Sequence, residues 1–141
     1  MPALLAEKFA VDFAAEWIAA WNAHDLDLIL KHYARDIEFT SPFVRRLLPT
    51  NEKTLRGIDL LRIYFSHALN AYPDLRFVAR RVYSGEHSLV IEYESVANLL
   101  AAEMMEFNDQ ALVCRVRAHY TTFMCDGASV GGVIAVPVGL I

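Results

Sequence analysis

A concentrated basic field is absent from this chain of 141 residues, whose formal net charge is −4. Its basic side chains are scattered, apart from the adjacent pairs Arg45-Arg46 and Arg80-Arg81. Proteins that bind nucleic acid normally present such a field, so we expect no nucleic-acid partner.

Cysteine is scarce, since the sequence contains only Cys114 and Cys125. If one strand joins them, they lie roughly 36 Å apart at about 3.3 Å per residue, which is too far for a disulfide. We therefore predict reduced thiols and a cytoplasmic location. Metal-ligand spacing is also missing: His24 and His32, for example, lie eight residues apart across a helix start. We predict neither a metal nor a cofactor.

Long hydrophobic runs are missing as well. Glu7, Lys8 and Asp12 interrupt the apolar N-terminus, so residues 1–17 do not have the pattern of a signal peptide. The longest apolar stretch, residues 130–141, is too short to span a bilayer and contains glycine and proline. We expect no membrane association.

Apolar residues are abundant, at 55% of the sequence with a positive mean hydropathy. The length suits one domain with one core, so we assign residues 1–141 to a single domain. So high an apolar fraction means either an unusually rich core or an apolar surface covered by a partner subunit. We favour the second explanation, a homodimer.

Three helices are expected. The first, of about five turns, is indicated by apolar residues four apart, at Leu5, Phe9, Phe13, Trp17 and Trp21. Asp25 is suited to cap a second helix over residues 26–33. A third helix spans residues 58–72, because the residue before Pro73 is steered out of helical geometry.

The other segments alternate between apolar and polar residues, as strands do. A first strand over residues 37–40 ends at Ser41-Pro42, and residues 44–56 form a loop. Four strands follow, over residues 75–83, 88–100, 111–124 and 130–138, with residues 101–109 as a looser connection. This order predicts an α+β fold with helices against one face of a mostly antiparallel sheet.

Residues 20–42, AWNAHDLDLILKHYARDIEFTSP, are followed by GIDLLRIYF, AYPD and a late Asp-Gly turn. This succession resembles the nuclear transport factor 2-like superfamily, and within it the SnoaL-like branch that includes polyketide cyclases. The resemblance covers roughly residues 8–127. It implies a cone-shaped barrel, in which a curved sheet wraps around the long N-terminal helix, with an apolar pocket at the wide end. It also implies a homodimer formed through the sheet.

Ketosteroid isomerase is a cousin of this branch, and its general-base Asp acts with a Tyr and a protonated Asp. Matching its motifs to this chain places the Tyr at Trp17 and the base at Ser41. The second Asp falls near Tyr120 or Thr121. A serine cannot act as a carboxylate base, so the familiar steroid isomerisation is not expected. SnoaL-like cyclases usually carry an acidic residue on the last strand, and this chain has no ionisable side chain after Asp126.

Three residues are candidates for polar chemistry. Ser41 would be an orienting donor and Tyr120 an oxyanion donor, since Tyr120 shares the strand parity of small and apolar residues suited to the inner face. His119 has the opposite parity. If the register shifts by one residue, His119 becomes the best general base, because imidazole titrates near neutrality. The alternative is a solvated or interface histidine.

Aromatic and hydroxyl side chains would form the pocket walls, at Trp17, Trp21, Tyr33, Phe43, Tyr64, Tyr93 and Thr122. The same aromatic residues would also suit an ordinary filled core. We predict a protein that binds a small apolar or ring-containing organic ligand. The alternative is a cofactor-free acid–base enzyme, an isomerase, cyclase or hydratase, acting on such a ligand. The missing carboxylates favour the first, because an enzyme needs an ionisable group lining the cavity.

Overall fold

The computed structural model describes residues 6–121, 123–124 and 134–135. Its helices there are α1 (Glu7–Asn22), α2 (Leu26–Leu30), α3 (Val44–Leu47) and α4 (Ile58–Ala71), with a 3₁₀ turn η1 (Val96–Asn98). The main strands are β1 (Tyr33–Thr40), β2 (Thr54–Arg56), β3 (Val78–Gly85), β4 (Ser88–Glu94), β5 (Leu100–Phe107) and β6 (Val113–Tyr120). Two short strands, β7 (Phe123–Met124) and β8 (Ile134–Ala135), pair with each other.

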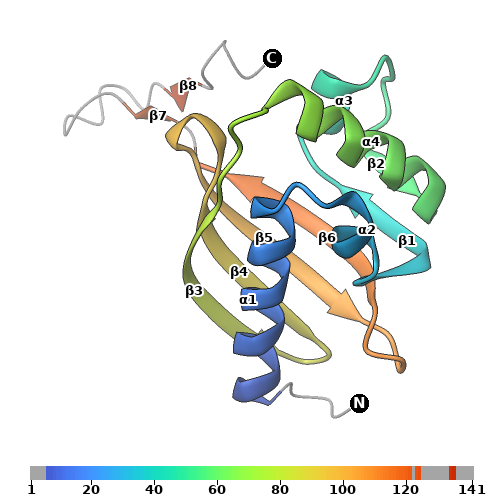
Figure 1. Cartoon of the computed structure of the whole chain (residues 1–141), viewed down its shortest axis with the longest axis vertical. Coiled ribbons are helices and arrows are strands. Elements are labelled where there is room, and N and C mark those ends of the chain that lie inside the picture. Colours follow the sequence, from blue (N-terminus) through green and yellow to red (C-terminus); the bar gives the residue numbers. More distant parts are fainter. Residues whose placement is uncertain (1–5, 122, 125–133, 136–141) are drawn as a thin grey trace.

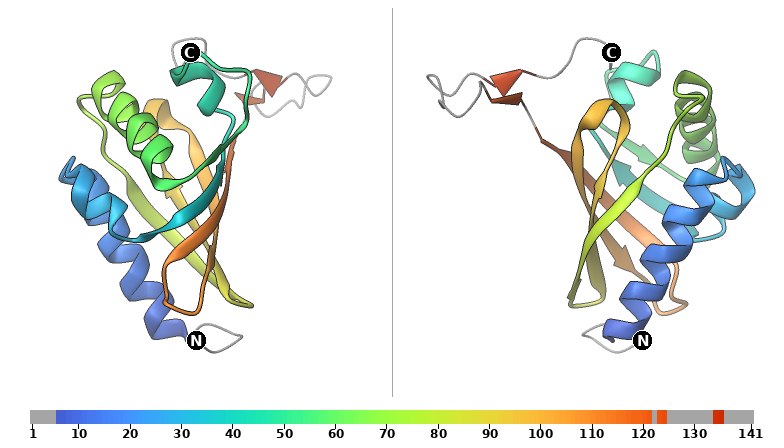
Figure 2. Two further views of the ribbon diagram at one scale, coloured as in Figure 1. Left: turned by 90° about the vertical axis from the view of Figure 1, so that its right-hand side faces the viewer. Right: turned by 60° about the vertical axis from the view of Figure 1, so that its left-hand side comes forward.

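The six main strands form one curved, open sheet in the order β2-β1-β6-β5-β4-β3. β1 and β6 are parallel, and every other neighbouring pair is antiparallel. The helices cover the concave face of this sheet, which leaves the convex face uncovered by helices (Figures 1 and 2). The predicted α+β class with a mostly antiparallel sheet is confirmed.

The first helix presents the face that its spacing predicts. Phe13, Trp17 and Trp21 are buried, and Phe9 packs against the core beside them. Leu5, the first residue of the predicted series, lies outside the described residues. Asp25 caps α2 as expected, because its Oδ1 accepts a hydrogen bond from the Leu28 N–H at 3.1 Å. The second helix is shorter than predicted, since Tyr33 already belongs to β1.

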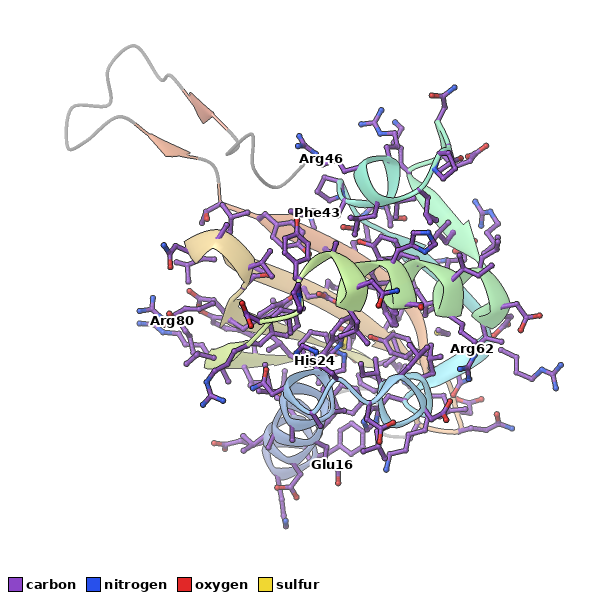
Figure 3. The ribbon with its side chains drawn as sticks, turned by 45° about the horizontal axis from the view of Figure 1, so that its top comes forward. Glu16, His24, Phe43, Arg46, Arg62 and Arg80 are labelled. Atoms are coloured by element: carbon purple, nitrogen blue, oxygen red, sulfur yellow. The ribbon has the colours of Figure 1, made fainter. Side chains whose placement is uncertain are left out.

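The end of α1 is tied to the segment that enters β3. The Asn22 side chain donates to the Phe77 carbonyl at 2.9 Å and accepts from the Phe77 N–H at 2.7 Å. His24 Nε2 lies 2.8 Å from the Leu75 carbonyl, at the point where α1 ends (Figure 3). These bonds fix the long helix against the concave face of the sheet.

Two predicted connections contain secondary structure. The loop predicted over residues 44–56 contains α3 and β2, so the described residues form four α-helices rather than three. Residues 101–109, predicted as a looser connection, form most of β5 in the middle of the sheet. Ala, Glu and Met dominate this strand, and they favour helices over strands. The strand predicted over residues 130–138 lies outside the described residues except at β8.

An aromatic cluster fills the space between the helices and the sheet. Trp17 meets Tyr93 edge-on at a centroid distance of 5.2 Å, and Trp21 meets Phe65 edge-on at 4.8 Å. These rings come from α1, β4 and α4, so the core joins both layers. Within the described part of the chain, no helix is both long and apolar enough to cross a membrane.

Candidate functional site

A mainly apolar cavity of about 50 Å³ opens between the helices and the inner face of the sheet. Leu47 of α3, Tyr72 after α4 and Val96 of η1 form part of its lining. Its aromatic walls are Trp17, Trp21, Phe39, Phe43, Tyr64, Phe65, Tyr72, Phe77, Tyr93 and Tyr120. A few water molecules fit this volume, whereas an engineered cavity that binds benzene measures about 150 Å³.

Among the described residues that line this cavity, Glu103 is the one with a carboxyl side chain. It lies on β5 with its side chain inward, and it is only 3% exposed. Tyr93 Oη donates a hydrogen bond to Glu103 Oε1 at 2.8 Å. Burial raises the pKa of Glu103 from 4.5 to about 7, although the bond from Tyr93 acts in the opposite direction. The group therefore exchanges a proton close to neutral pH.

The surroundings of Glu103 explain why its charge is poorly stabilised. Its cross-strand neighbours are Ile91 on β4 and Ala118 on β6, and both are apolar. No Lys, Arg or His is found among the described residues that line the cavity. A buried carboxylate without a cation favours its neutral form, so desolvation dominates.

Hydroxyl groups connect Glu103 with the end of β1. The Tyr120 hydroxyl interacts with the side chains of Tyr93 and Ser41, and Ser41 also interacts with Tyr64. Ser41 is 1% exposed, and its Oγ accepts from the Phe43 N–H at 3.2 Å. Burial raises the pKa of each of the three tyrosines well above its usual value, so they remain protonated donors. The cavity therefore holds a chain of neutral donors that leads to one acidic group.

The predicted wall residues fall into three groups. Trp17, Trp21, Phe43, Tyr64 and Tyr93 line the cavity, and their binding of a ligand stays a prediction. Tyr33 is buried but does not line it, because its hydroxyl accepts from Trp17 Nε1 at 2.9 Å. Thr122 lies outside the described residues.

The polar candidates separate according to strand parity. Tyr120 faces inward and meets the Phe43 ring edge-on at 4.6 Å. His119 faces outward and is exposed, so the register shift that would make it the base does not occur. The structure thus places His119 away from the cavity and Glu103 within it.

Sequence reasoning missed Glu103, although a signal for it was present. Ala101, Glu103, Met105 and Phe107 alternate with outward residues, and all four are buried. Residues 101–109 were predicted as a looser connection, so the inward position of Glu103 was not recognised. Its position between Ala101 and Met105 instead marks a polar group carried into the core by strand parity.

Residues 14–130 match the model of the SnoaL-like domain family. A SnoaL-like protein of unknown function from Burkholderia thailandensis is 37% identical, with a TM-score of 0.80 over 86% of this chain and 99% of that one. A protein from Kribbella flavida, provisionally named a ketosteroid isomerase, is 17% identical with a TM-score of 0.65, over 94% of this chain and 93% of its own.

The epoxide hydrolase/cyclase-like enzyme SalBIII, which takes part in pyran ring formation in the polyether salinomycin, has the same fold. It is 13% identical with a TM-score of 0.65, over 81% of this chain and 92% of its own. No curated protein matches the sequence. The match over residues 14–130 and the 37% identity show that this chain belongs to the SnoaL-like domain family.

Proposed function

We propose that the protein is a cofactor-free acid–base enzyme that acts on a small, uncharged, ring-containing organic ligand. The observation that carries this proposal is Glu103, a buried carboxyl group on the cavity wall with a pKa near 7. The sequence favoured a non-catalytic pocket because no carboxylate could be assigned to it. Glu103 removes that reason.

The pKa of Glu103 suits a group that both takes and returns a proton, since a general base works best when its pKa is near the operating pH. The ionised carboxylate removes a proton from a carbon next to a carbonyl group. The electron pair of that C–H bond forms a C=C bond to the carbonyl carbon, and the carbonyl π electrons move to its oxygen. The ligand thereby becomes an enolate. Tyr120 is the hydroxyl donor for this oxygen, and the protonated Glu103 then returns the proton to the same or another carbon.

The cavity walls support a ligand of this kind. Aromatic rings dominate them, and the described lining offers no cation to hold an anionic ligand. A ring needs more than the present 50 Å³ or so, so side chains must move when it enters. Leu47, Tyr72 and Val96 are half-buried residues of the lining, and we expect them to move more readily than its fully buried rings.

Proton exchange at carbon tests the proposal without knowledge of the natural substrate. Cyclohexanone in D₂O is incubated with the protein, and loss of its α-proton signal is followed by NMR. We expect exchange above the buffer rate, rising with pH through a midpoint near 7 as Glu103 ionises. Glu103→Gln should lower the protein-dependent rate by at least about 100-fold, because the general base is lost.

Glu106→Gln is the matched control, because Glu106 lies on the same strand and pairs with Arg115 outside the cavity. It should leave the exchange rate unchanged. Equal rates for wild type and Glu103→Gln would contradict the proposal. If cyclohexanone binds in the cavity and no exchange exceeds the buffer rate, a ligand-binding function without catalysis replaces it.

We also propose a cytoplasmic homodimer formed through the convex face of the sheet. The exposure of two large apolar side chains on β3 supports this choice of surface, since Val78 is 44% and Tyr83 is 47% exposed. The apolar fraction of 55% is a second support, since a partner subunit would cover part of it. The cytoplasmic location rests on the scarcity of cysteine.

A further inference from the structure

Trp21 carries a hydrogen-bond donor that the fold does not use. The residue is 5% exposed and lines the cavity, and its Nε1 is buried without an acceptor among the described residues. The other indole differs, because Trp17 Nε1 donates to the Tyr33 hydroxyl at 2.9 Å. Buried N–H groups nearly always have a partner in native proteins, so a free one at a cavity needs an explanation.

Trp21 and Glu103 line the cavity from different layers of the fold. Trp21 belongs to the helical layer and packs against Phe65 of α4, whereas Glu103 lies on the sheet beside Tyr93. The Phe77 ring lies 5.4 Å from that of Trp21 and 4.7 Å from that of Tyr93. The Trp17 ring also contacts the rings of Trp21 and Tyr93, at centroid distances of 6.1 and 5.2 Å. The rings of Phe77 and Trp17 therefore link the wall that carries the indole donor to the wall that carries Tyr93 and Glu103.

We propose that the Trp21 N–H binds a second oxygen acceptor of the ligand, distinct from the reacting carbonyl. The ligand class is then an uncharged ring compound with two oxygen acceptors, such as a cyclic diketone. An indole N–H can only donate, so it selects a carbonyl or ether oxygen and disfavours a hydrocarbon edge. This inference rests on the proposed function, because it assigns the ligand of the same cavity.

Cyclohexane-1,4-dione and cyclohexanone are suitable probes, since they differ in the second carbonyl and little in size. The chain has two tryptophans, so ¹⁵N-labelled tryptophan gives two indole signals. We expect the dione to move the Trp21 indole proton downfield and to leave that of Trp17 in place. We also expect it to bind about five- to tenfold more tightly than cyclohexanone, as one neutral hydrogen bond would give.

Trp21→Phe removes the donor and keeps an aromatic ring, so it should assign the signal and make the two affinities equal. Trp17→Phe is the control, because its N–H is already bound to Tyr33, and it should keep the preference for the dione. A Trp21 signal that does not move when the dione binds would overturn the inference. Equal affinities of the wild type for the two probes would also overturn it, and so would the failure of both probes to bind. The wild-type affinities do not depend on whether either variant folds, and either variant alone assigns both indole signals.

The two proposals can fail separately. Exchange that depends on Glu103, combined with an unmoved Trp21 signal, would leave the enzyme proposal and remove the indole site. A shifted Trp21 signal without exchange that depends on Glu103 would leave the binding site and remove the catalytic role.

Discussion

Glu103 shows how one side chain acquires its chemistry from the strand that carries it. The alternation of β5 turns the carboxyl group inward, where burial raises its pKa to about 7. Folded protein therefore keeps a proton at pH values where the unfolded chain, with a pKa near 4.5, has lost it. The stabilising effect is complete below about pH 4.5 and disappears as the pH rises through about 7.

This linkage predicts a pH dependence that belongs to Glu103 alone. Glu103→Gln keeps the size and polarity of the side chain but cannot ionise. Relative to this variant, the unfolding free energy of the wild type should fall by up to roughly 3 kcal/mol between pH 4 and pH 8.5. Urea unfolding at several pH values measures it. A constant difference between the two proteins across this range would contradict the raised pKa, and Glu106→Gln should follow the wild type.

At the scale of secondary structure, sequence spacing predicts elements well where one face is strictly apolar. The buried side of α1 and the cap at Asp25 follow from local rules, and both are confirmed. β5 escapes those rules, because its residues favour helices and its inner face holds a carboxylate. Such a strand is fixed by its neighbours β4 and β6 and not by local preference.

The residues of the candidate site also differ in how far the sequence predicts them. Ring positions such as Trp17, Trp21 and Tyr64 are predictable, because helical spacing places them on buried faces. Glu103 is not, because its role depends on which strands flank it. α3 and β2 were missed for a related reason. With four and three residues, they are too short to show a helical or strand periodicity in the sequence.

The junction between α1 and β3 depends on one side chain that bonds twice to the backbone. Asn22→Ala removes both bonds to Phe77 and leaves a partly buried N–H and C=O without that partner. We expect a loss of about 2 kcal/mol in unfolding free energy, measured by urea unfolding. Asn51→Ala, at an exposed position, should change stability by less than about 0.5 kcal/mol. Similar effects of the two substitutions would show that the Asn22 bonds do not stabilise the junction.

At the scale of the whole molecule, the described helices cover the concave face of the sheet and not the convex face, where we propose the dimer interface (Figure 2). A glutamate at Tyr83, which is 47% exposed on β3, would place a charge in the proposed interface. We expect Tyr83→Glu to convert a dimer to monomers in size-exclusion chromatography with light scattering. Leu60→Glu, at a similarly exposed position on α4, should leave the dimer intact. A monomeric wild type would refute the interface.

The parallel pairing of β1 with β6 also has a consequence for biosynthesis. It joins Tyr33 to Val113, so the middle of the sheet cannot close until nearly all of the described chain has left the ribosome. Until then, only the part of the sheet formed by β3, β4 and β5 can cover the aromatic surface of α1. Contacts so distant in sequence slow folding and lengthen the time in which apolar segments are open to aggregation. The arrangement that encloses Glu103 thus makes the nascent chain depend on protection late in its synthesis.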